Sequence, residues 1–278
     1  METILIPTDF SDTSKNAALY AIDLGKQIKA KKIILYNTYQ APVSVSPDPM
    51  VPALEIFDLK TVKKTSEENL QLFKFKFLAY CDNSLIIETL CEFNMLAGGI
   101  DEVCSRLHID LIVMGITGGG TIEESLFGSN TIKVARNTNV PVIIVPAKAN
   151  YTSIHKVALV TDFYNVAHSI PVVPIKKILD STSAELHIVH VERGSDGIDD
   201  NTFESSEMDK LFEGFEPKYH FIHSDDFVEG INDFVFDEQI DLVIIVPKKH
   251  GLFESIFKTS HTKHLAFHSD IPLMEVHG

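Results

Sequence analysis

A run of small residues follows an apolar segment in the first half of the chain. The segment Asp110–Met114 leads to Gly115 and Gly118, and Gly128-Ser129 follows with nine residues between Gly118 and Gly128. Glycine lacks a Cβ, so backbone N–H groups at such positions can approach a ligand closely. A glycine and a hydroxyl at a helix start form an anion site, because N–H groups point outward there and the helix dipole favours negative charge. The pattern therefore predicts a site for a phosphate chain.

Other polar residues lack the partners that catalysis or metal binding requires. Ser129 has no Gly-x-Ser-x-Gly elbow around it and no assignable His or acid, so we interpret it as a phosphate hydrogen-bonding group. His261 and His264 have helical spacing, with His268 one turn on, but we find no further ligand that would close a metal site. We therefore expect no catalytic residue and no metal held by protein side chains.

Alternating strand and helix patterns must position the phosphate site. The expected strands of the first half are apolar and rich in β-branched residues, and cover Thr3–Pro7, Lys32–Tyr36, Ser84–Leu90, Asp110–Met114 and Val142–Val145. Such alternation predicts a parallel sheet with helices on both faces. In open parallel sheets of this kind, ligands bind beyond the carboxyl ends of the strands. Asp9 and Gly115 both lie at those ends. In the second helix, Phe73 and Phe77 suit the core, whereas Phe75 is expected to point elsewhere, into a domain interface.

The same pattern returns in the second half in the same order. Val157–Phe163 matches Ile4–Phe10, and Asp241–Val246 matches Asp110–Gly115. Repeats in one order indicate a tandem copy of one fold. We expect domains at residues 1–147 and 155–278, joined by a polar linker.

The second copy departs from the first at the proposed site. Val246 stands at the place of Gly115 and Lys258 at the place of Gly128, so side chains would fill the path that glycine leaves open. Pro171 and Pro174 fall where the first copy has an unbroken helix pattern, so that helix should start late or bend. We expect the second domain to keep the scaffold without the first domain's site.

Composition narrows the class of partner. The 278 residues include 24 Lys and Arg against 39 Asp and Glu, a formal charge of −15, which argues against nucleic acid. The three cysteines are odd in number and lack metal-type spacing, as expected for free thiols in a reducing compartment. No signal-type leader and no apolar run near the ~18 residues of a membrane helix is present, so we expect a cytoplasmic protein that contacts no membrane.

The spacing Gly-x2-Gly-x9-Gly-Ser resembles the ATP-binding pattern of the universal stress protein family, and Ile4–Ser11 resembles that family's first strand. The resemblance implies an α/β fold of two tandem open five-stranded parallel sheets, each with strand order 3-2-1-4-5 and helices on both faces. It also implies ATP as ligand, with Mg²⁺ accompanying the phosphates. The residues that it implies at the nucleotide are Pro7, Thr8, Asp9, Asn37, Met114, Gly115, Gly118, Gly128, Ser129 and Asn130.

Members of this family often pair through their last strands. The resemblance therefore implies an intramolecular pseudo-dimer, in which Val142–Val145 and Leu273–Val276 lie antiparallel and close together. It leaves open a further homodimer of the whole chain. It also implies a stress-response regulatory role with an unknown protein partner, to which the nucleotide would report energy state.

Two other functions stay open. One is a slow ATP hydrolase or a nucleotide-dependent transferase of the related adenine-nucleotide hydrolase-like superfamily, and the other is a scaffold without a ligand. The loop Gly115–Gly128 contains no Lys or Arg, and Lys133 and Arg136 come later on the expected helix. Phosphoryl transfer needs a cation or a base beside the phosphates, so this loop favours binding over turnover.

Overall fold

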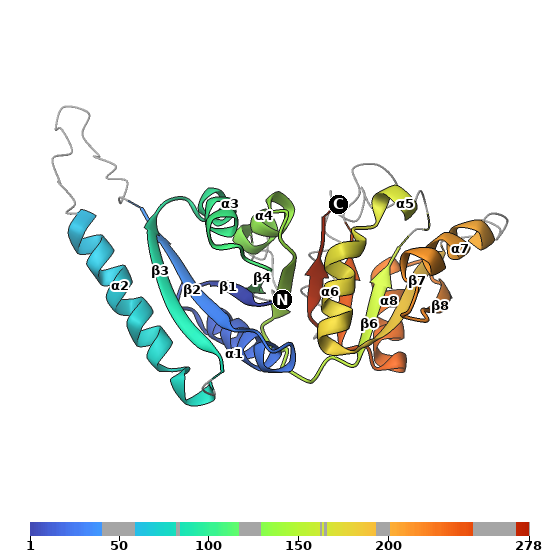
Figure 1. The fold of residues 1–278 in the computed structure, drawn as a ribbon, viewed down its shortest axis with the longest axis horizontal. Helices are drawn as coiled ribbons and strands as arrows, with labels where there is room; N and C mark the ends of the chain where they lie inside the picture. The colour runs from blue at the N-terminus through green and yellow to red at the C-terminus, as the bar shows by residue number, and fades with distance from the viewer. Residues whose placement is uncertain are drawn as a thin grey trace, which may run out of the picture.

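The computed structural model describes residues 1–40, 59–81, 84–116, 129–161, 163, 166–192, 201–246 and 271–277. Gly118, Gly128 and the three histidines His261, His264 and His268 lie outside these ranges. Strands and helices alternate in both halves of the chain (Figure 1). The first half contains β1 (Thr3–Pro7), α1 (Asp12–Gln27), β2 (Lys32–Tyr39), α2 (Leu59–Phe75), the 3-10 turn η1 (Leu78–Tyr80), β3 (Ile86–Phe93), α3 (Leu96–Leu107), β4 (Leu111–Ile116), α4 (Ser129–Asn137) and β5 (Val142–Pro146). The second half contains β6 (Lys156–Val160), α5 (Val166–Ser169), α6 (Val172–Thr182), β7 (Glu185–Glu192), α7 (Asn201–Leu211), β8 (Lys218–His223), α8 (Phe227–Glu238), β9 (Leu242–Ile245) and β10 (Leu273–Glu275). In the part of the chain described, no helix combines the length and the apolar character needed to cross a bilayer.

The strands form one sheet in the order β3-β2-β1-β4-β5-β10-β9-β6-β7-β8. Each half therefore has the order 3-2-1-4-5, and all pairs within a half are parallel. This confirms the expected fold class. The two parallel halves do not stay separate, because their last strands join them into one sheet.

The junction of the halves is an antiparallel pair of strands. Leu273 lies opposite Ile144, Met274 opposite Ile143 and Glu275 opposite Val142. This confirms the expected pairing of the last strands. Both strands are buried on both faces, so the buried core is continuous across the junction of the two halves.

Helices cover both faces of the sheet, and each face has its own apolar core. One core joins α1 and α2 with α6 and α7, and the other joins α3 and α4 with α8. Side chains of β4 alternate between them, with Val113 in the first core and Met114 in the second. Such strands, apolar on both sides, are typical of buried parallel sheets.

The helix that follows the first strand differs between the halves. α1 is one unbroken helix, whereas its counterpart is split into α5 and α6 at Pro171, which caps α6. Pro174 falls in the first turn of α6, where a missing backbone N–H removes no intrahelical bond. The interruption predicted from the two prolines is thus confirmed.

The expectation for Phe75 was wrong. Phe73 and Phe77 are buried, but Phe75 is 76% exposed. Helix α2 packs on the edge strand β3 and its neighbour β2, far from the junction (Figure 1). Phe75 therefore faces solvent on the outer side of α2. The helical period of the sequence places Phe75 on a different face of α2 from Phe73 and Phe77. Only the order of the strands in the sheet shows that this face meets solvent.

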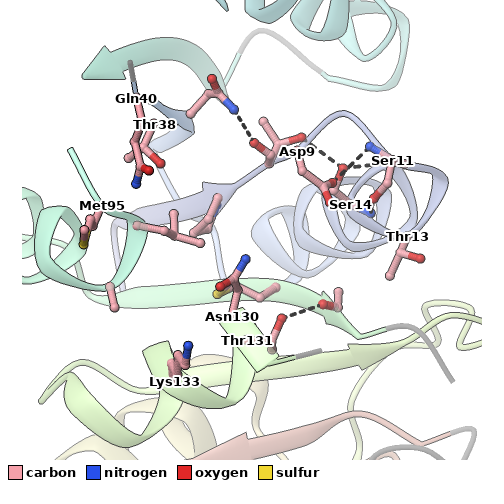
Figure 2. A pocket seen from close by; sticks show the side chains of 17 residues that line it. Asp9, Ser11, Thr13, Ser14, Thr38, Gln40, Met95, Asn130, Thr131 and Lys133 are labelled. Carbon is pink, nitrogen blue, oxygen red and sulfur yellow. Dashed lines mark hydrogen bonds between the residues drawn. The ribbon is translucent and has the colours of Figure 1, made fainter. Parts of the chain in front are cut away.

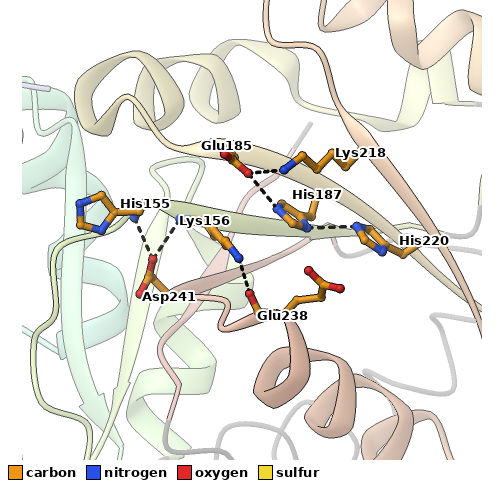
Figure 3. A network of polar contacts seen from close by, with 8 residues as sticks. All are labelled: His155, Lys156, Glu185, His187, Lys218, His220, Glu238 and Asp241. Carbon is orange, nitrogen blue, oxygen red and sulfur yellow. Dashed lines mark hydrogen bonds and ion pairs between the residues drawn. The ribbon is translucent and has the colours of Figure 1, made fainter.

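An aspartate before the fourth strand of each half holds the start of that half's first strand. Oδ2 of Asp110 accepts the backbone N–H groups of Glu2 and Thr3 at 2.8 and 3.2 Å. Asp241 does the same with His155 and Lys156 at 2.8 and 3.0 Å (Figure 3). Partial burial alone would raise the pKa of Asp110, but the two N–H groups outweigh it and the pKa is lowered. The carboxylate is therefore a structural group repeated in both copies.

We predict that Asp110→Ala and Asp241→Ala each lower the free energy of unfolding by about 1–2 kcal/mol, because two N–H groups lose their acceptor. The two aspartates are separated by three strand spacings of about 4.8 Å, so the double variant should be additive within about 0.5 kcal/mol. Urea unfolding measures both effects. Asp23→Ala, which removes only an exposed ion pair with Lys26, is the control, and an equal loss in all three single variants would contradict the prediction.

Two histidines stack on one another between β7 and β8. The rings of His187 and His220 are nearly parallel, with centroids 5.0 Å apart, and Nδ1 of His187 lies 3.0 Å from Nε2 of His220 (Figure 3). Phe234 of α8 packs edge-on against His220. Burial, with the nearby charge of Lys218, lowers the pKa of both rings, and the neighbouring ring further lowers that of His187. Both histidines are therefore neutral in the folded protein at pH 7.

A lowered pKa in the folded state gives stability that is present above the unfolded pKa of about 6.5 and is lost as the pH falls through the folded value. Glu185 and Glu238 face the pair and oppose this loss in part. We predict that replacing both rings, His187→Phe with His220→Phe, makes unfolding less sensitive to pH between 7.5 and 5.5. Exposed His155→Phe is the control. An unchanged pH slope in the double variant would count against the prediction.

Candidate functional site

A cavity of about 690 Å³ opens at the carboxyl ends of β1, β2 and β4 (Figure 2). Strands β1 and β4 are adjacent, and the helices that follow them, α1 and α4, pack on opposite faces of the sheet, in different cores. This is the switch point at which open α/β sheets bind ligands. The volume lies in the range of small-molecule pockets. The seventeen lining residues are Pro7, Thr8, Asp9, Ser11, Thr13, Ser14, Asn37, Thr38, Gln40, Met95, Leu96, Ala97, Met114, Gly115, Asn130, Thr131 and Lys133.

The turn between β1 and α1 forms one side of the cavity. Thr8 Oγ1 accepts the N–H of Phe10 at 3.0 Å and lies 3.0 Å from Ser14 Oγ. Phe10 has a φ of 67°, a left-handed conformation that lets the chain turn sharply after the strand. Ser11 caps α1 by accepting the N–H of Ser14. The turn is therefore held by hydroxyl groups at fixed places, and it presents Asp9 to the cavity.

Asp9 is an exposed carboxylate with a fixed orientation. Its Oδ1 accepts the backbone N–H of Ser11 at 3.0 Å. Partial burial alone would raise the pKa of Asp9, but hydrogen bonds from Ser11 and Ser14 outweigh it and leave the pKa below the ordinary value. The group is ionised at neutral pH. It can accept hydrogen bonds from hydroxyl or amino groups, but it is a weak base.

The amino-terminal end of α4 forms the opposite side. Asn130 and Thr131 lie in its first turn and Lys133 one turn from Asn130, and all three line the cavity (Figure 2). Thr131 is buried, and its hydroxyl donates to the carbonyl O of Gly115 at 2.8 Å, which ties the helix start to β4. The first N–H groups of a helix have no partner within the helix, so they and the helix dipole favour an anion at this end, and the Lys133 cation adds to this effect.

Gly115 has a different structural reason from the one expected. A Cβ at this position would lie 2.5 Å from the carbonyl O of Thr13 and 2.7 Å from its Cγ2. The space that the glycine leaves open is thus filled by the first turn of α1. Its backbone still lines the cavity, but the missing side chain serves the approach of α1 to β4.

Seven of the ten residues expected at the site line the cavity. These are Pro7, Thr8, Asp9, Asn37, Met114, Gly115 and Asn130. Ser129 is the first residue of α4, and its side chain lies outside what the structure describes, as do Gly118 and Gly128. Among the described residues, no group of three or more His, Cys, Asp or Glu side chains is arranged to hold a metal ion.

Lys133 is the main residue that sequence reasoning left out of the site. The sequence marks it only as a cation on the expected helix after the loop. Asn130 and Lys133 are three residues apart, and residues at that spacing share a helix face. The spacing could therefore have identified it. Thr13 and Met95 gave no such signal, because they reach the cavity from elements that the motif does not include.

The second half repeats part of this arrangement. Thr161 Oγ1 accepts the N–H of Phe163, which has a φ of 53°, as Thr8 accepts that of Phe10. His190 takes the place of Asn37, and its Nδ1 lies 2.9 Å from the carbonyl O of Thr161. Val246 is 3% exposed, so its side chain is packed within the fold. Lys258, expected at the place of Gly128, lies outside the described residues.

Comparison with known proteins identifies the family to which the first half is similar. Residues 1–146, more than half of the chain, match the model of the universal stress protein family. Two universal stress proteins of Methanocaldococcus jannaschii are similar in sequence. MJ0531 is 34% identical over 142 residues, which are 51% of this chain and 80% of that protein. MJ0577 is 25% identical over 154 residues, which are 52% and 94%.

The fold is also found in a solved structure of similar length. A universal stress protein from Archaeoglobus fulgidus superposes with a TM-score of 0.70 over 99% of this chain and 96% of that one. At 19% identity this likeness concerns the fold alone. The match of the family model to the half that contains the cavity, together with the strand order, shows that the chain belongs to the universal stress protein family.

Proposed function

We propose that the cavity of the first half binds ATP and that the chain is a regulatory protein of the stress response. The observation that carries the proposal is the polarity of the cavity. The carboxylate of Asp9 lies on one side, and the amino-terminal end of α4 with Lys133 lies on the other (Figure 2). A nucleotide has the same polarity, because its sugar hydroxyls can donate hydrogen bonds and its phosphates are anionic.

The orientation of the nucleotide follows from this polarity. The phosphates lie at the first turn of α4, near Asn130 and Lys133, with Ser129, Gly118 and Gly128 as further ligands. The sugar lies at Asp9, and the base lies toward Asn37 and Met114. Mg²⁺ accompanies the phosphates, held by their oxygens and by water rather than by a cage of protein carboxylates.

Isothermal titration with ATP tests the proposal. We expect heat of binding at ATP concentrations below about 1 mM. A dissociation constant of about 1 mM corresponds to a binding free energy of about −4 kcal/mol. Absence of heat at that concentration, with and without MgCl₂, would refute the proposal. A mass spectrum of small molecules that co-purify with the protein separates ATP binding from a scaffold without ligand.

We predict that Lys133→Ala weakens ATP binding at least tenfold, because a hydrogen bond to a charged group contributes about 1.5–3 kcal/mol. Lys26→Ala is the matched control, since Lys26 lies in the last turn of α1 and is paired with Asp23. Equal affinities of the two variants would contradict the placement of the phosphates.

An ATP hydrolase or a nucleotide-dependent transferase is the second candidate. The described lining residues include one cation, Lys133, and one carboxylate, Asp9, whose lowered pKa makes it a poor general base. This composition supports binding with slow or no turnover. A steady-state rate on the order of 1 per second would reverse that preference.

We further propose that residues 1–147 and 155–278 act as two domains of one pseudo-dimer, in which the second supports the first and carries no equivalent ATP site. ATP stabilises the liganded form and makes it available to a protein partner. The three free thiols Cys81, Cys91 and Cys104 support a reducing, cytoplasmic location.

A further inference from the structure

A row of side-chain hydrogen bonds runs from the edge strand β3, through α2, to the lining of the cavity. Cys91 Sγ lies 2.9 Å from Ser66 Oγ, and Ser66 Oγ lies 2.5 Å from Asn37 Oδ1. Asn37 Nδ2 lies 2.7 Å from the carbonyl O of Thr8, at the end of β1. Ser66 is 7% exposed and Asn37 lines the cavity, so the row ends at the candidate site.

Each bond in this row has only one possible direction. A carbonyl oxygen only accepts, so the atom of Asn37 that faces Thr8 must be the amide nitrogen, and Oδ1 must face Ser66. The hydroxyl of Ser66 donates to Oδ1, so its proton is not available to Cys91. Cys91 therefore donates its thiol proton to Ser66. Burial raises the pKa of Cys91, which keeps that proton in place.

The amide of Asn37 is thus held at both of its polar atoms. Its Nδ2 carries two protons, and only one is used by Thr8. The second has no partner among the residues that the structure describes. We propose that Ser66, supported by Cys91, is a positioning residue that fixes this N–H as a hydrogen-bond donor to the bound base. The base must then present an acceptor atom to this N–H, and in adenine the acceptors are the ring nitrogens. This inference rests on the proposed binding of ATP.

The second half separates the two roles of Asn37. His190 stands at the same place and also contacts the threonine carbonyl at the end of the first strand, through Nδ1. The contact at the strand end is therefore common to both halves. An imidazole nitrogen carries one proton at most, so it has no second N–H to offer from that atom. The second N–H of Asn37, and the bond of its Oδ1 to Ser66, therefore belong to the first half.

Three ATP analogues test the proposal, each with one acceptor nitrogen of the base replaced by C–H: 1-deaza-ATP, 3-deaza-ATP and 7-deaza-ATP. We expect wild-type protein to bind one of the three about fivefold or more weakly than ATP, as for the loss of one hydrogen bond. In Ser66→Ala the same analogue should show a much smaller penalty, because ATP itself binds less well. Thr65→Ala removes a neighbouring exposed hydroxyl of α2 and should keep the wild-type penalty.

Cys91 gives a second matched pair. Cys91→Ser keeps a proton donor and should preserve the analogue penalty, whereas Cys91→Ala should reduce it. A general loss of packing in α2 would weaken all four nucleotides equally and leave the ratios unchanged. Identical ratios in wild type, Ser66→Ala and Cys91→Ala, with ATP still bound, would overturn this inference and leave the proposed function standing. Wild-type protein that binds none of the nucleotides would overturn both.

A measurement without ligand keeps the two proposals distinct. In ¹⁵N-labelled protein, the side-chain NH₂ signal of Asn37 reports how firmly the amide is held. We expect Ser66→Ala to speed exchange of these protons with water, and Thr65→Ala to leave it unchanged. Equal exchange in both variants would show that Ser66 does not position the amide.

Discussion

Gly115→Ala should abolish nucleotide binding at 1 mM and lower the free energy of unfolding by about 1–3 kcal/mol, as overpacking does. The added methyl group would overlap the Thr13 carbonyl O at 2.5 Å, so the first turn of α1 must move. Ser11 and Ser14 lie in that same turn and hold Asp9 and Thr8. A shift of the turn therefore displaces one whole side of the cavity. Titration with ATP and urea unfolding measure the two effects.

Gly98→Ala is the matched control. A Cβ on Gly98 would meet only Asn94 Oδ1 at 3.9 Å, an ordinary contact, although Gly98 lies close to the lining residues Met95 to Ala97. Alanine in place of glycine within α3 should stabilise the helix by up to about 1 kcal/mol and leave ATP affinity unchanged. If Gly115→Ala bound ATP as well as Gly98→Ala does, the contact between α1 and β4 would have no influence on the site.

Met274→Ala should be the most destabilising truncation at the junction of the halves. Met274 is fully buried in the middle of β10, opposite Ile143, and belongs to the core that joins α1 and α6. Removal of a buried methionine side chain costs about 2–5 kcal/mol. Because this side chain contributes to both halves, we expect the loss to appear in a single unfolding transition measured in urea without nucleotide.

Met95→Ala provides the comparison, because Met95 is 71% exposed and the chemical change is identical. Its effect on stability should stay within about 0.5 kcal/mol. A Met274→Ala protein as stable as Met95→Ala would mean that the antiparallel strands contribute little to the fold.

The fold could be predicted from the sequence because its pattern is local and written twice. The segments Ile4–Phe10 and Val157–Phe163 each show one strand and the same sharp turn, and the structure has a φ near 60° at Phe10 and Phe163. The prolines at 171 and 174 gave the broken helix for an equally local reason. Strand order and the pairing of the last strands came from the family resemblance and not from the residues, and both are confirmed.

The candidate site could be predicted only in part. Asp9 and Asn130 follow strands or begin helices, so the topology alone brings them to one edge. The contact that explains Gly115 comes from Thr13, about a hundred positions earlier, and no local signal indicates it. Ser66 is 29 residues from Asn37 and 25 from Cys91, and joins them only because α2 packs on β2 and β3. Such long-range contacts depend on packing, which a single sequence does not reveal.

The antiparallel meeting of β5 and β10 also sets the direction in which each half faces. Strands of the first half run one way and those of the second half run the other, so their carboxyl ends emerge on opposite rims of the sheet. A protein bound over the candidate site of the first half would leave the opposite rim of the sheet uncovered. The two rims therefore present the strand ends of different halves, and a molecule bound at one rim does not cover the other.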